Sequence, residues 1–166
     1  MRLLITGTPG TGKTTIARAL AKELKLKYFN EMEVSVKQNI GHWDTVENEL
    51  VVPLPKLKKA LEKQVKGLKN YVIEGHMVCE IKLPVDLAIV LQVHPELLEQ
   101  RLEYKQYKME KLLDNVFCEG IEYCKKHALR KYGTKKVVCV QNNNSIKETL
   151  GKILLVLGKQ KLLKSF

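Results

Sequence analysis

The sequence "GTPGTGKT" spans Gly7 to Thr14 and matches the pattern G-x-x-x-x-G-K-[ST] in full. It follows a short apolar run, Arg2 to Thr6, that indicates a strand, and it precedes an amphipathic stretch, Thr14 to Leu24, that indicates a helix. Glycines in such a loop let consecutive backbone N–H groups turn inward around a polyphosphate, and the helix N-terminus adds partial positive charge. The stretch therefore predicts a site for a nucleoside triphosphate, and the alternative is a glycine-rich turn without a ligand.

The side chains of this loop have distinct expected roles. Lys13 is expected to reach the β- and γ-phosphates, and the hydroxyl of Thr14 is expected to ligate Mg²⁺. Thr15 is expected to support the α-phosphate, while the backbone of Gly10 and Gly12 holds the donor nucleotide.

A second apolar run, Tyr71 to Glu74, ends in a carboxylate that is followed by Gly75 and His76. Open α/β sheets bind ligands at the carboxyl ends of their strands, so this carboxylate is expected to face the phosphate-binding loop. We predict that Glu74, together with Thr14, holds the hydration shell of the magnesium ion or orients a water molecule. His76 either orients water or contacts the substrate, or it is an ordinary polar residue of the loop.

The rest of the chain alternates between β-rich runs and helical patterns, which predicts an α/β fold with a parallel sheet. Further strands are expected at 27–29, 87–93 and 136–140, and further helices from Pro53, from Pro95 and from about Met109 to Tyr132. A capping-box pattern at 145–148 begins a last helix. The polar stretch 30–52 permits a helix with one apolar side. The expected inward residues are Ile16, Ala17, Leu20, Ala21 and Leu24; Met32, Val36 and Ile40; Leu54, Leu57, Leu61, Val65 and Leu68; Leu97, Leu98 and Leu102; Ile146, Leu150, Ile153, Leu154 and Leu157.

Length and composition limit the class of protein. The 166 residues fit one domain, 1–166, and 45% hydrophobic with 28% charged residues are ordinary for a soluble globular protein. No apolar run approaches 18 residues and the N-terminal apolar stretch is too short for a signal peptide, so a cytoplasmic protein without membrane contact is expected. The four cysteines form no C-x-x-C pair, which favours reduced, buried thiols over a metal site.

The charge is strongly basic, with 29 Lys and Arg against 18 Asp and Glu and a formal net charge of +11. Such a balance favours polyanionic partners, namely nucleotides, RNA or the ribosome. The alternative is a solvated, lysine-rich surface, because only four of the 29 basic residues are arginines.

A pair of cations suggests which kind of phosphate-loop protein this is. Arg101 and Lys105 lie four apart near the end of the helix from Pro95, so both project from one face before a tight break at 106–108. Small kinases close such cations over the transferring phosphoryl group, whereas a GTPase needs a base-reading motif that "VQNNNS" (140–145) does not supply. The alternative is a solvated basic helix face.

The whole arrangement resembles the adenylate-kinase-like NTPase family of archaea and eukaryotic nuclei, which is associated with maturation of the small ribosomal subunit. The resemblance covers the chain from Leu3 to about Ile153. It rests on the stretches "ITGTPGTGKTT" (5–15), "KYFN" (27–30), "VIEGH" (72–76), "LPVDLAIVL" (83–91) and "RLEYKQYKMEKLLDN" (101–115), followed by Cys118-Glu119. Glu74, His76, Arg101, Tyr107, Lys111, Asp114 and Asn115 match the motifs of the family.

The resemblance implies a three-layer nucleoside monophosphate (NMP) kinase fold, with a five-stranded parallel sheet and short NMP-binding (about 30–53) and lid (about 104–114) segments. It implies transfer of the γ-phosphoryl of Mg·ATP to an NMP with broad specificity, ATP hydrolysis, and a role in rRNA processing with the small ribosomal subunit or one of its proteins. Arg101 and Lys105 would close over the developing charge, and the loop 141–144, with Asn144, would pass the adenine ring.

Two departures from the family pattern bear on this expectation. Lys105 stands where the family has a second lid arginine, and Gln106 stands where it has a glycine. Lysine keeps the charge but loses the planar fork that binds phosphate oxygens in pairs. The stretch "VVPLPK" (51–56) lacks the usual acidic acceptor residues, which leaves Glu47 and Glu49 as candidates.

Two other functions fit the same donor site. In the first, the nucleotide cycle of an ATP-driven assembly factor remodels a ribosomal partner. In the second, the chain is a kinase of another small acceptor, such as shikimate or dephospho-coenzyme A.

Overall fold

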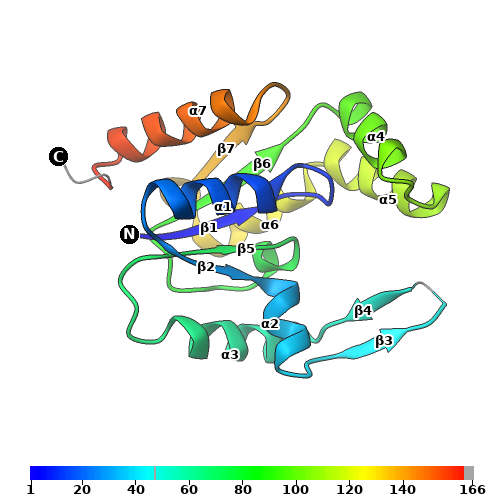
Figure 1. Cartoon of the computed structure of the whole chain (residues 1–166), viewed down its shortest axis with the longest axis horizontal. Coiled ribbons are helices and arrows are strands. Elements are labelled where there is room, and N and C mark those ends of the chain that lie inside the picture. The colour runs from blue at the N-terminus through cyan, green and yellow to red at the C-terminus, as the bar shows by residue number, and fades with distance from the viewer. Residues whose placement is uncertain (47, 163–166) are drawn as a thin grey trace.

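The computed structural model describes residues 1–46 and 48–162. Its centre is a sheet in which five parallel strands lie in the order β2-β5-β1-β6-β7 (Figure 1). The strands are β1 (Arg2–Thr6), β2 (Lys27–Asn30), β5 (Tyr71–Glu74), β6 (Leu87–Gln92) and β7 (Val137–Gln141). The predicted five-stranded parallel sheet is thus confirmed, and β1, which leads into the phosphate-binding loop, lies at its middle.

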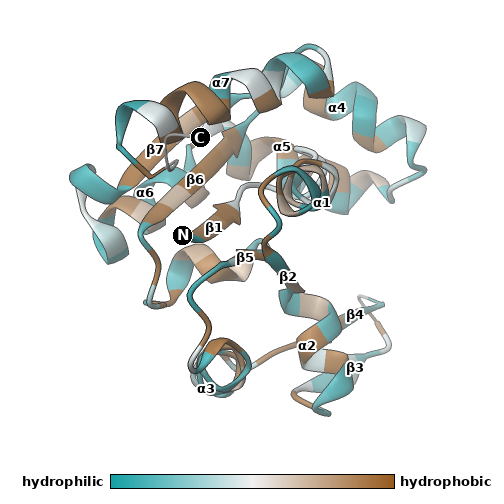
Figure 2. Cartoon of the chain, turned by 60° about the vertical axis from the view of Figure 1, so that its left-hand side comes forward, coloured by the Kyte–Doolittle hydropathy of each residue, from teal (hydrophilic) through white to brown (hydrophobic). Residues whose placement is uncertain are grey.

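Helices cover both faces of the sheet, which gives the three layers that were predicted (Figure 1). On one face, α1 (Lys13–Glu23) and α7 (Ile146–Lys159) pack against Leu3, Ile5 and Ile89. On the other face, the core joins α3 (Leu54–Val65) and α6 (Tyr123–Tyr132) to Leu4, Ile73 and Val90. Figure 2 shows this arrangement as brown, apolar strands between helices whose outer surfaces are mainly teal.

Two further helices lie past the carboxyl end of β6. They are α4 (Pro95–Tyr104) and α5 (Met109–Gly120), and they share a small core of Val93, Leu98, Leu102 and Leu112. This core is separate from the two that flank the sheet, so α4 and α5 form a projection of their own beside the phosphate-binding loop (Figure 1).

The polar stretch after β2 contains a helix and a hairpin. Helix α2 (Glu31–Lys37) confirms the helix that this stretch permits, and the strands β3 (His42–Asp44) and β4 (Glu49–Val51) then pair antiparallel. The predicted apolar side of the helix is wrong at two positions, because Met32 is 42% and Val36 61% exposed. The buried apolar residues of this stretch are instead Val34 and, as predicted, Ile40. The sequence did not predict the hairpin, because its three-residue strands are too short to show a period.

The single long helix expected from Met109 to Tyr132 is wrong. The chain breaks at Glu122, which adopts a left-handed conformation with φ +56°, so α5 ends at Gly120 and α6 begins at Tyr123. Because of this break, α5 packs against α4, whereas α6 runs in another direction and packs against the sheet with Cys124 and Ala128 buried. Two short 3₁₀ turns, η1 (Met77–Glu80) and η2 (Thr134–Lys136), complete the elements.

Two smaller expectations also need correction. Ile146 does not point into the core but is 49% exposed, because it lies in the first turn of α7 beyond the edge of the sheet. Of the four cysteines, Cys79 and Cys124 are buried free thiols as expected, whereas Cys118 is half-buried and Cys139 is exposed. In the part of the chain that the structure describes, no helix is long and apolar enough to cross a membrane.

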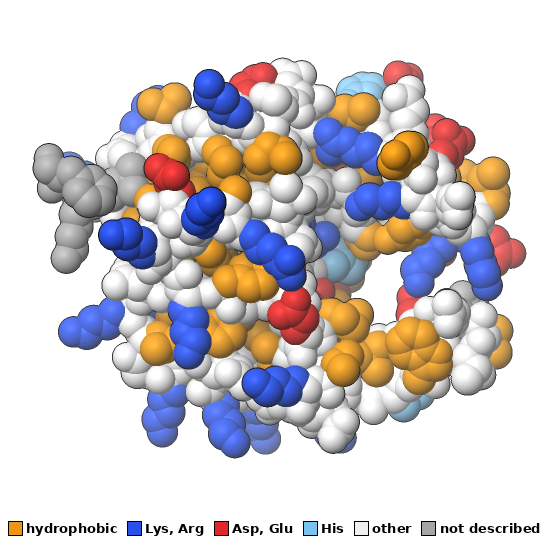
Figure 3. Space-filling view, in the orientation of Figure 1, with side chains coloured by type: hydrophobic (Ala, Val, Ile, Leu, Met, Phe, Trp, Pro, Cys, Tyr) orange, Lys and Arg blue, Asp and Glu red, His pale blue; other side chains and the backbone are white. Residues whose placement is uncertain are grey.

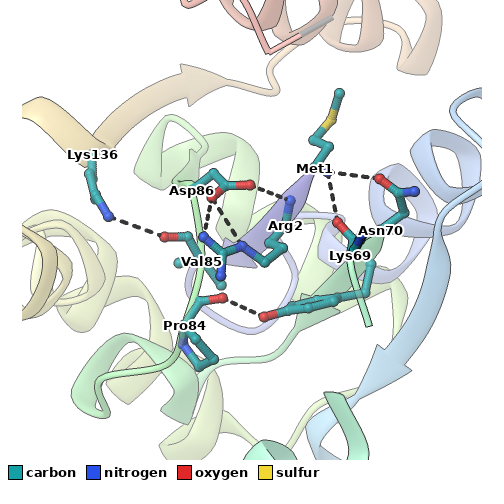
Figure 4. A network of polar contacts seen from close by, with 9 residues as sticks. Met1, Arg2, Lys69, Asn70, Pro84, Val85, Asp86 and Lys136 are labelled. Carbon is teal, nitrogen blue, oxygen red and sulfur yellow. Dashed lines mark hydrogen bonds and ion pairs between the residues drawn. The ribbon is translucent and has the colours of Figure 1, made fainter. Parts of the chain in front are cut away.

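Polar contacts hold together the opposite edge of the sheet, where β1 begins (Figure 4). The Met1 ammonium donates to the Lys69 carbonyl and to Asn70 Oδ1, both at 2.8 Å. The Arg2 guanidinium donates to Asp86 Oδ1 from Nε (3.0 Å) and Nη2 (2.6 Å), and the Arg2 backbone N–H donates to Oδ2 at 2.8 Å. Burial alone would raise the pKa of Asp86, but these hydrogen bonds lower it below its usual value.

We predict that Asp86→Ala lowers the free energy of unfolding by about 1–3 kcal/mol at pH 7, because three donors of Arg2 lose a charged acceptor. The contribution of a carboxyl whose pKa is lowered on folding is present above its unfolded pKa and disappears as pH falls through its folded pKa. Urea unfolding of both proteins at pH 7 and near pH 3 should therefore show a difference that shrinks in acid.

The control is Glu62→Ala, since Glu62 faces Lys58 across an exposed 3.8 Å pair. This change should cost less than about 0.5 kcal/mol. An equal loss in both variants, or a loss at Asp86 that does not depend on pH, would contradict the role given to the Arg2–Asp86 pair.

Candidate active site

The phosphate-binding loop lies between β1 and α1, and other elements pack tightly against its glycines. Gly10 and Gly12 have φ angles of +93° and +90°, a region that favours glycine. A Cβ on Gly10 would lie 2.8 Å from side-chain atoms of Leu98 and Leu102 in α4, and one on Gly12 would lie 2.6 Å from Asn142 Nδ2. The glycines are therefore required both by the shape of the loop and by the side chains that surround it.

Lys13 is the first residue of α1, and its ammonium donates to the carbonyl of Thr8 at 3.1 Å. Burial lowers the pKa of this ammonium, and the nearby carboxylates of Glu31 and Glu74 partly oppose that effect. The lysine is thus held folded over the loop, where a bound polyphosphate would supply the opposite charge that the loop itself lacks.

Glu74 lies at the carboxyl end of β5, beside the loop, as predicted. Its Oε1 accepts hydrogen bonds from Thr14 Oγ1 (2.9 Å), from the Tyr28 hydroxyl (2.8 Å) and from Asn30 Nδ2. Glu74 is only 1% exposed, so this is a buried carboxylate with a fixed orientation. Burial and the hydrogen bond to Glu74 raise the pKa of Tyr28 to about 12, which keeps that phenol a hydrogen-bond donor.

This corner fits a magnesium ion that arrives with a nucleotide. Mg²⁺ is usually bound through one or two protein groups together with phosphates and water, rather than by a cage of side chains. The described residues contain no group of three or more His, Cys, Asp or Glu that could hold a metal alone. All three hydrogen bonds that Glu74 accepts within the described residues go to Oε1, which leaves Oε2 for the shell of the metal.

A cavity of about 400 Å³ opens beside the loop, between α4 and the start of α7. Predicted residues meet there: Gly10, Gly12, Thr15, Arg101, Lys105 and Asn144. Arg101 donates from Nη2 to the carbonyl of Asn142 at 2.8 Å, and burial lowers its pKa. Asn144 donates to both oxygens of Glu148, at 2.9 Å each, at the mouth of the cavity. Ile146, misplaced in the sequence-based core, lines the cavity together with Ile16 and Leu97.

His76 lies outside this cavity, behind the beginning of the loop. Its Nδ1 is 3.2 Å from the carbonyl oxygen of Gly7 and 3.4 Å from Cys124 Sγ, and its ring stacks at 6.0 Å on Tyr123. Burial would lower the pKa of His76, but its hydrogen bond with Cys124 raises it. Hydrogen bonds with Cys79 and His76 lower the pKa of Cys124 to about 5. The structure therefore places His76 next to the loop but does not bring it together with Arg101 and Lys105.

Glu119 of α5 is a site residue to which sequence reasoning gave no role. It is buried, and its Oε2 accepts from Thr8 Oγ1 at 2.5 Å while its Oε1 accepts from the backbone N–H of Val93 at 2.8 Å. Thr8 in turn uses its carbonyl to hold Lys13 and Thr11. Glu119 thus links the projecting helices to the first turn of the loop, and only its place after Cys118 in the family motif hinted at it.

Asn142 fastens the other side of the loop. Its side chain donates from Nδ2 to the carbonyl of Thr11 at 2.8 Å and accepts from Thr149 Oγ1 of α7 at 2.7 Å. Its own carbonyl accepts the hydrogen bond from Arg101. The loop 141–144 was predicted to lie at the nucleotide site, but the prediction named Asn144 and gave Asn142 no role. The signal that the sequence offered was an amide side chain directly after the last strand.

Glu31, the first residue of α2, supports the turn that carries Glu74 and His76. It is 5% exposed and accepts hydrogen bonds from the backbone N–H groups of His76 (2.6 Å), Met77 (3.1 Å) and Val78 (3.0 Å). A Cβ on Gly75 would lie 2.0 Å from Glu31 Cδ, so the glycine is needed for this approach. Nothing local in the sequence marked Glu31 as different from the exposed glutamates around it.

A second cavity, of about 520 Å³, lies between the hairpin and α5. It is lined by Glu49, Glu110, Lys111 and Asp114, and Lys111 Nζ donates to Glu49 Oε2 at 2.7 Å across its edge. Figure 3 shows it as a hollow on the right, closed on its outer side by lysine side chains. Glu49, an acceptor candidate from the sequence, is therefore placed here, whereas Glu47 lies outside the described residues.

Comparison with known proteins identifies relatives of the whole arrangement. The model of a family described as "AAA domain" matches residues 3–122. Three archaeal proteins named "Putative adenylate kinase" are similar to the chain. The one from Pyrococcus furiosus is 40% identical over 74% of this chain and 65% of its own length, just under two thirds. The one from Thermococcus kodakarensis is 38% identical over 79% of this chain and 71% of its own length. The one from Pyrococcus abyssi is 34% identical over 90% of this chain and 79% of its own length.

Solved structures share the fold at lower sequence identity. The shikimate kinase of Bacteroides thetaiotaomicron superposes with a TM-score of 0.67 at 19% identity, covering 95% of this chain and 98% of that one. The deoxyadenosine kinase of M. mycoides with bound dATP superposes with a TM-score of 0.64 at 17% identity, covering 95% of this chain and 100% of that one. These likenesses confirm the three-layer fold of phosphate-loop kinases.

We predict that Glu119→Gln weakens ATP binding roughly ten-fold or more. The change replaces a charged acceptor of two donors by an amide that offers one oxygen, and hydrogen bonds to charged groups contribute about 1.5–3 kcal/mol. Titration calorimetry with Mg·ATP measures the loss directly, and circular dichroism shows whether the fold is kept.

Glu122→Gln provides the matched control, because Glu122 lies three residues further on and its carboxylate accepts hydrogen bonds from Gln92 and Lys125 rather than from the loop. This variant should bind ATP like the native protein. Equal affinities for the native protein and Glu119→Gln would show that Thr8 does not need its partner in α5.

Proposed function

The chain belongs to the adenylate-kinase-like family of P-loop phosphotransferases, and from this premise we propose that it transfers the γ-phosphoryl group of Mg·ATP to a nucleoside monophosphate. The observation that carries the proposal is the phosphate-binding loop with a cavity beside it that Arg101 and Lys105 line, together with a second cavity between the hairpin and α5. One lies between α4 and α7 and the other between the hairpin and α5, so a donor and an acceptor have separate places. The names of the archaeal relatives support a nucleotide as the substrate.

In this proposal, the loop and β5 hold the donor. The backbone N–H groups around Gly10 and Gly12 and the ammonium of Lys13 bind the polyphosphate, and Thr15 supports its α-phosphate. Thr14 and Glu74 would hold the magnesium ion, which neutralises charge on the phosphate oxygens. Little covalent work falls to the protein, so its contribution is to position the reactants and to stabilise charge.

The segment 104–114 is proposed as the lid, and Arg101 and Lys105 as its cations. Both line the donor cavity, but Arg101 donates to the Asn142 carbonyl, so its guanidinium would exchange that partner for phosphate oxygens. His76, which lies beside the start of the loop, would orient water or the substrate. Asn144 and the neighbouring backbone would lie alongside the adenine ring.

The segment 30–53, which contains α2 and the hairpin, is proposed as the acceptor side. Its hairpin meets α5 through the Glu49–Lys111 ion pair, which encloses the second cavity. Opening of this pair would admit the monophosphate, and its closure would exclude water during transfer. The acidic lining of the cavity, with Glu110 and Asp114, suits the amino groups of a base better than it suits a phosphate.

A second candidate is an ATP-driven assembly factor that acts on a ribosomal partner, with slow ATP hydrolysis as its chemistry. The net charge of +11 and the replacement of a lid arginine by Lys105 favour this function. The cytoplasmic location and the role in rRNA processing expected from the sequence belong to this proposal and remain predictions.

Product analysis by ion-exchange chromatography distinguishes the two candidates. Purified protein is mixed with Mg·ATP and, separately, with AMP, CMP, UMP, GMP, shikimate or no acceptor. Fast formation of a nucleoside diphosphate that requires the monophosphate supports the kinase. Slow release of ADP and phosphate at the same rate in every mixture would make the protein an ATPase.

We predict that Lys13→Ala abolishes ATP turnover, because it removes the charge that holds the β- and γ-phosphates. Steady-state release of ADP measures this loss. Lys22→Ala, a change of an exposed lysine in the same helix, is the control and should leave turnover unchanged. Ordinary turnover by Lys13→Ala would refute the assignment of the donor site.

We also predict that Lys105→Arg raises phosphoryl transfer several-fold, because a guanidinium binds two phosphate oxygens at once. The comparison is kcat with saturating acceptor for the native protein, for Lys105→Arg and for Lys108→Arg, an exposed neighbour that does not line the donor cavity. A fall in kcat at position 105, or an equal rise at position 108, would mean that Lys105 is not a lid cation.

A further inference from the structure

Four lysines form a row along the outer side of α3. They are Lys56, Lys59, Lys63 and Lys66, and all four are exposed. Their spacings of three, four and three residues place them on one face of a helix, opposite the buried Leu57, Leu61 and Val65. We call this row the α3 lysine face. In Figure 3 it belongs to the group of blue side chains at the lower left, over the position of α3 in Figure 1.

The charge of this face is not balanced by the protein. Within residues 1–46 and 48–162, none of the four lysines makes an ion pair. The only acidic residue of α3, Glu62, lies 3.8 Å from Lys58, which is not in the row. Some lysines on other helices have local partners, such as Lys125 with Glu122 and Lys152 with Glu148, whereas others, such as Lys22 and Lys126, make no ion pair within the described residues either. What distinguishes the α3 lysine face is that four such lysines share one side of a single element.

Two hollows flank the row, and lysines of the row line both. One, of about 310 Å³, lies toward the end of α2 and is lined by Lys56, Lys59 and Lys63 with the polar side chains of Gln38 and Asn39. The other, of about 590 Å³, lies at the end of α3 and is lined by three cationic side chains, Lys63, Lys66 and Arg2, and by one carboxylate, Glu62. Neither hollow shares a lining residue with the donor cavity or the cavity beside Glu49.

We propose that the α3 lysine face binds the phosphate backbone of a nucleic acid. Lys66, the C-cap of α3, lies ten positions after Lys56, so the row extends about 15 Å along the helix axis. A duplex carries about nine phosphates over that length, counting both strands, so the row is long enough to meet several of them. This inference does not depend on the proposed phosphoryl transfer, because the face and the two catalytic cavities are made of different residues.

The chemistry of the face favours a nucleic acid over a membrane. The apolar side chains of α3 point into the core, so the helix has nothing to insert between lipids. The helix sequence, LPKLKKALEKQV, contains no aromatic residue to stack on bases and no arginine to read a guanine edge. The expected contact is therefore to phosphates alone and independent of base sequence.

Fluorescence anisotropy with a labelled RNA duplex of about 20 base pairs tests the inference, with a DNA duplex of the same sequence as a second arm. The variant is Lys59→Gln with Lys63→Gln and Lys66→Gln. The control removes the same charge from other exposed positions, with Lys22→Gln, Lys126→Gln and Lys131→Gln. Affinity is measured from about 50 to 200 mM salt, where each lost phosphate contact reduces the slope of log K against log salt by about 0.9.

We expect the α3 variant to lose at least ten-fold in affinity and to lower the slope by about 2 to 3, while the control stays within about two-fold of the native protein. Equal binding of RNA and DNA supports contact with the backbone alone, and tighter binding of RNA supports a preference for the A-form duplex. Equal losses in the two variants, or absence of binding by the native protein at low salt, would overturn the inference. Competition by polyglutamate as effective as by unlabelled RNA would overturn it in favour of an acidic protein.

Discussion

The hydrogen bond from Thr8 to Glu119 shows how the phosphate-binding loop keeps its shape. Within the loop, Thr11 and Lys13 donate to the Thr8 carbonyl, and buried side chains from distant elements hold the loop from outside. Glu119 of α5 holds the first turn, Asn142 after β7 holds the middle, and Glu74 of β5 holds Thr14. Asn142 also accepts the hydrogen bond from Arg101 of α4, so the loop, α4 and the segment after β7 are joined around the donor cavity.

Local patterns in the sequence predicted the helices and strands but not the hydrogen bonds by which Glu119 and Asn142 hold the loop. The strand, glycine-rich loop and helix from Arg2 to Glu23 follow from periodicity and a motif that lie within 22 residues. Glu74 was found because a carboxylate at the end of an apolar strand is unusual. Glu119 and Asn142 were not assigned, because their partners are 111 and 131 residues away and no periodicity connects them. The break at Glu122 was missed for the same reason, since only the packing of α5 and α6 against different elements requires it.

The departures from the family pattern also acquire a physical meaning. Gln106 adopts a φ of +57°, the left-handed conformation for which the family's glycine is suited, so the lid turn forms at a cost of about 1–2 kcal/mol. Lys105 beside it keeps a charge at the donor cavity without the fork of an arginine. The hairpin–α5 cavity differs from the donor cavity, because its own lining carries three carboxylates and one lysine.

In the proposed function, donor and acceptor occupy the two cavities at the same time. Titration calorimetry with a dinucleotide whose two adenosines are joined by five phosphates tests it directly, because such a molecule spans both sites. If both cavities bind, the second contact is intramolecular and the dissociation constant in the presence of Mg²⁺ should lie at least about 100-fold below that of ATP. A dissociation constant equal to that of ATP would contradict the account, since it would mean that only the donor site takes a nucleotide.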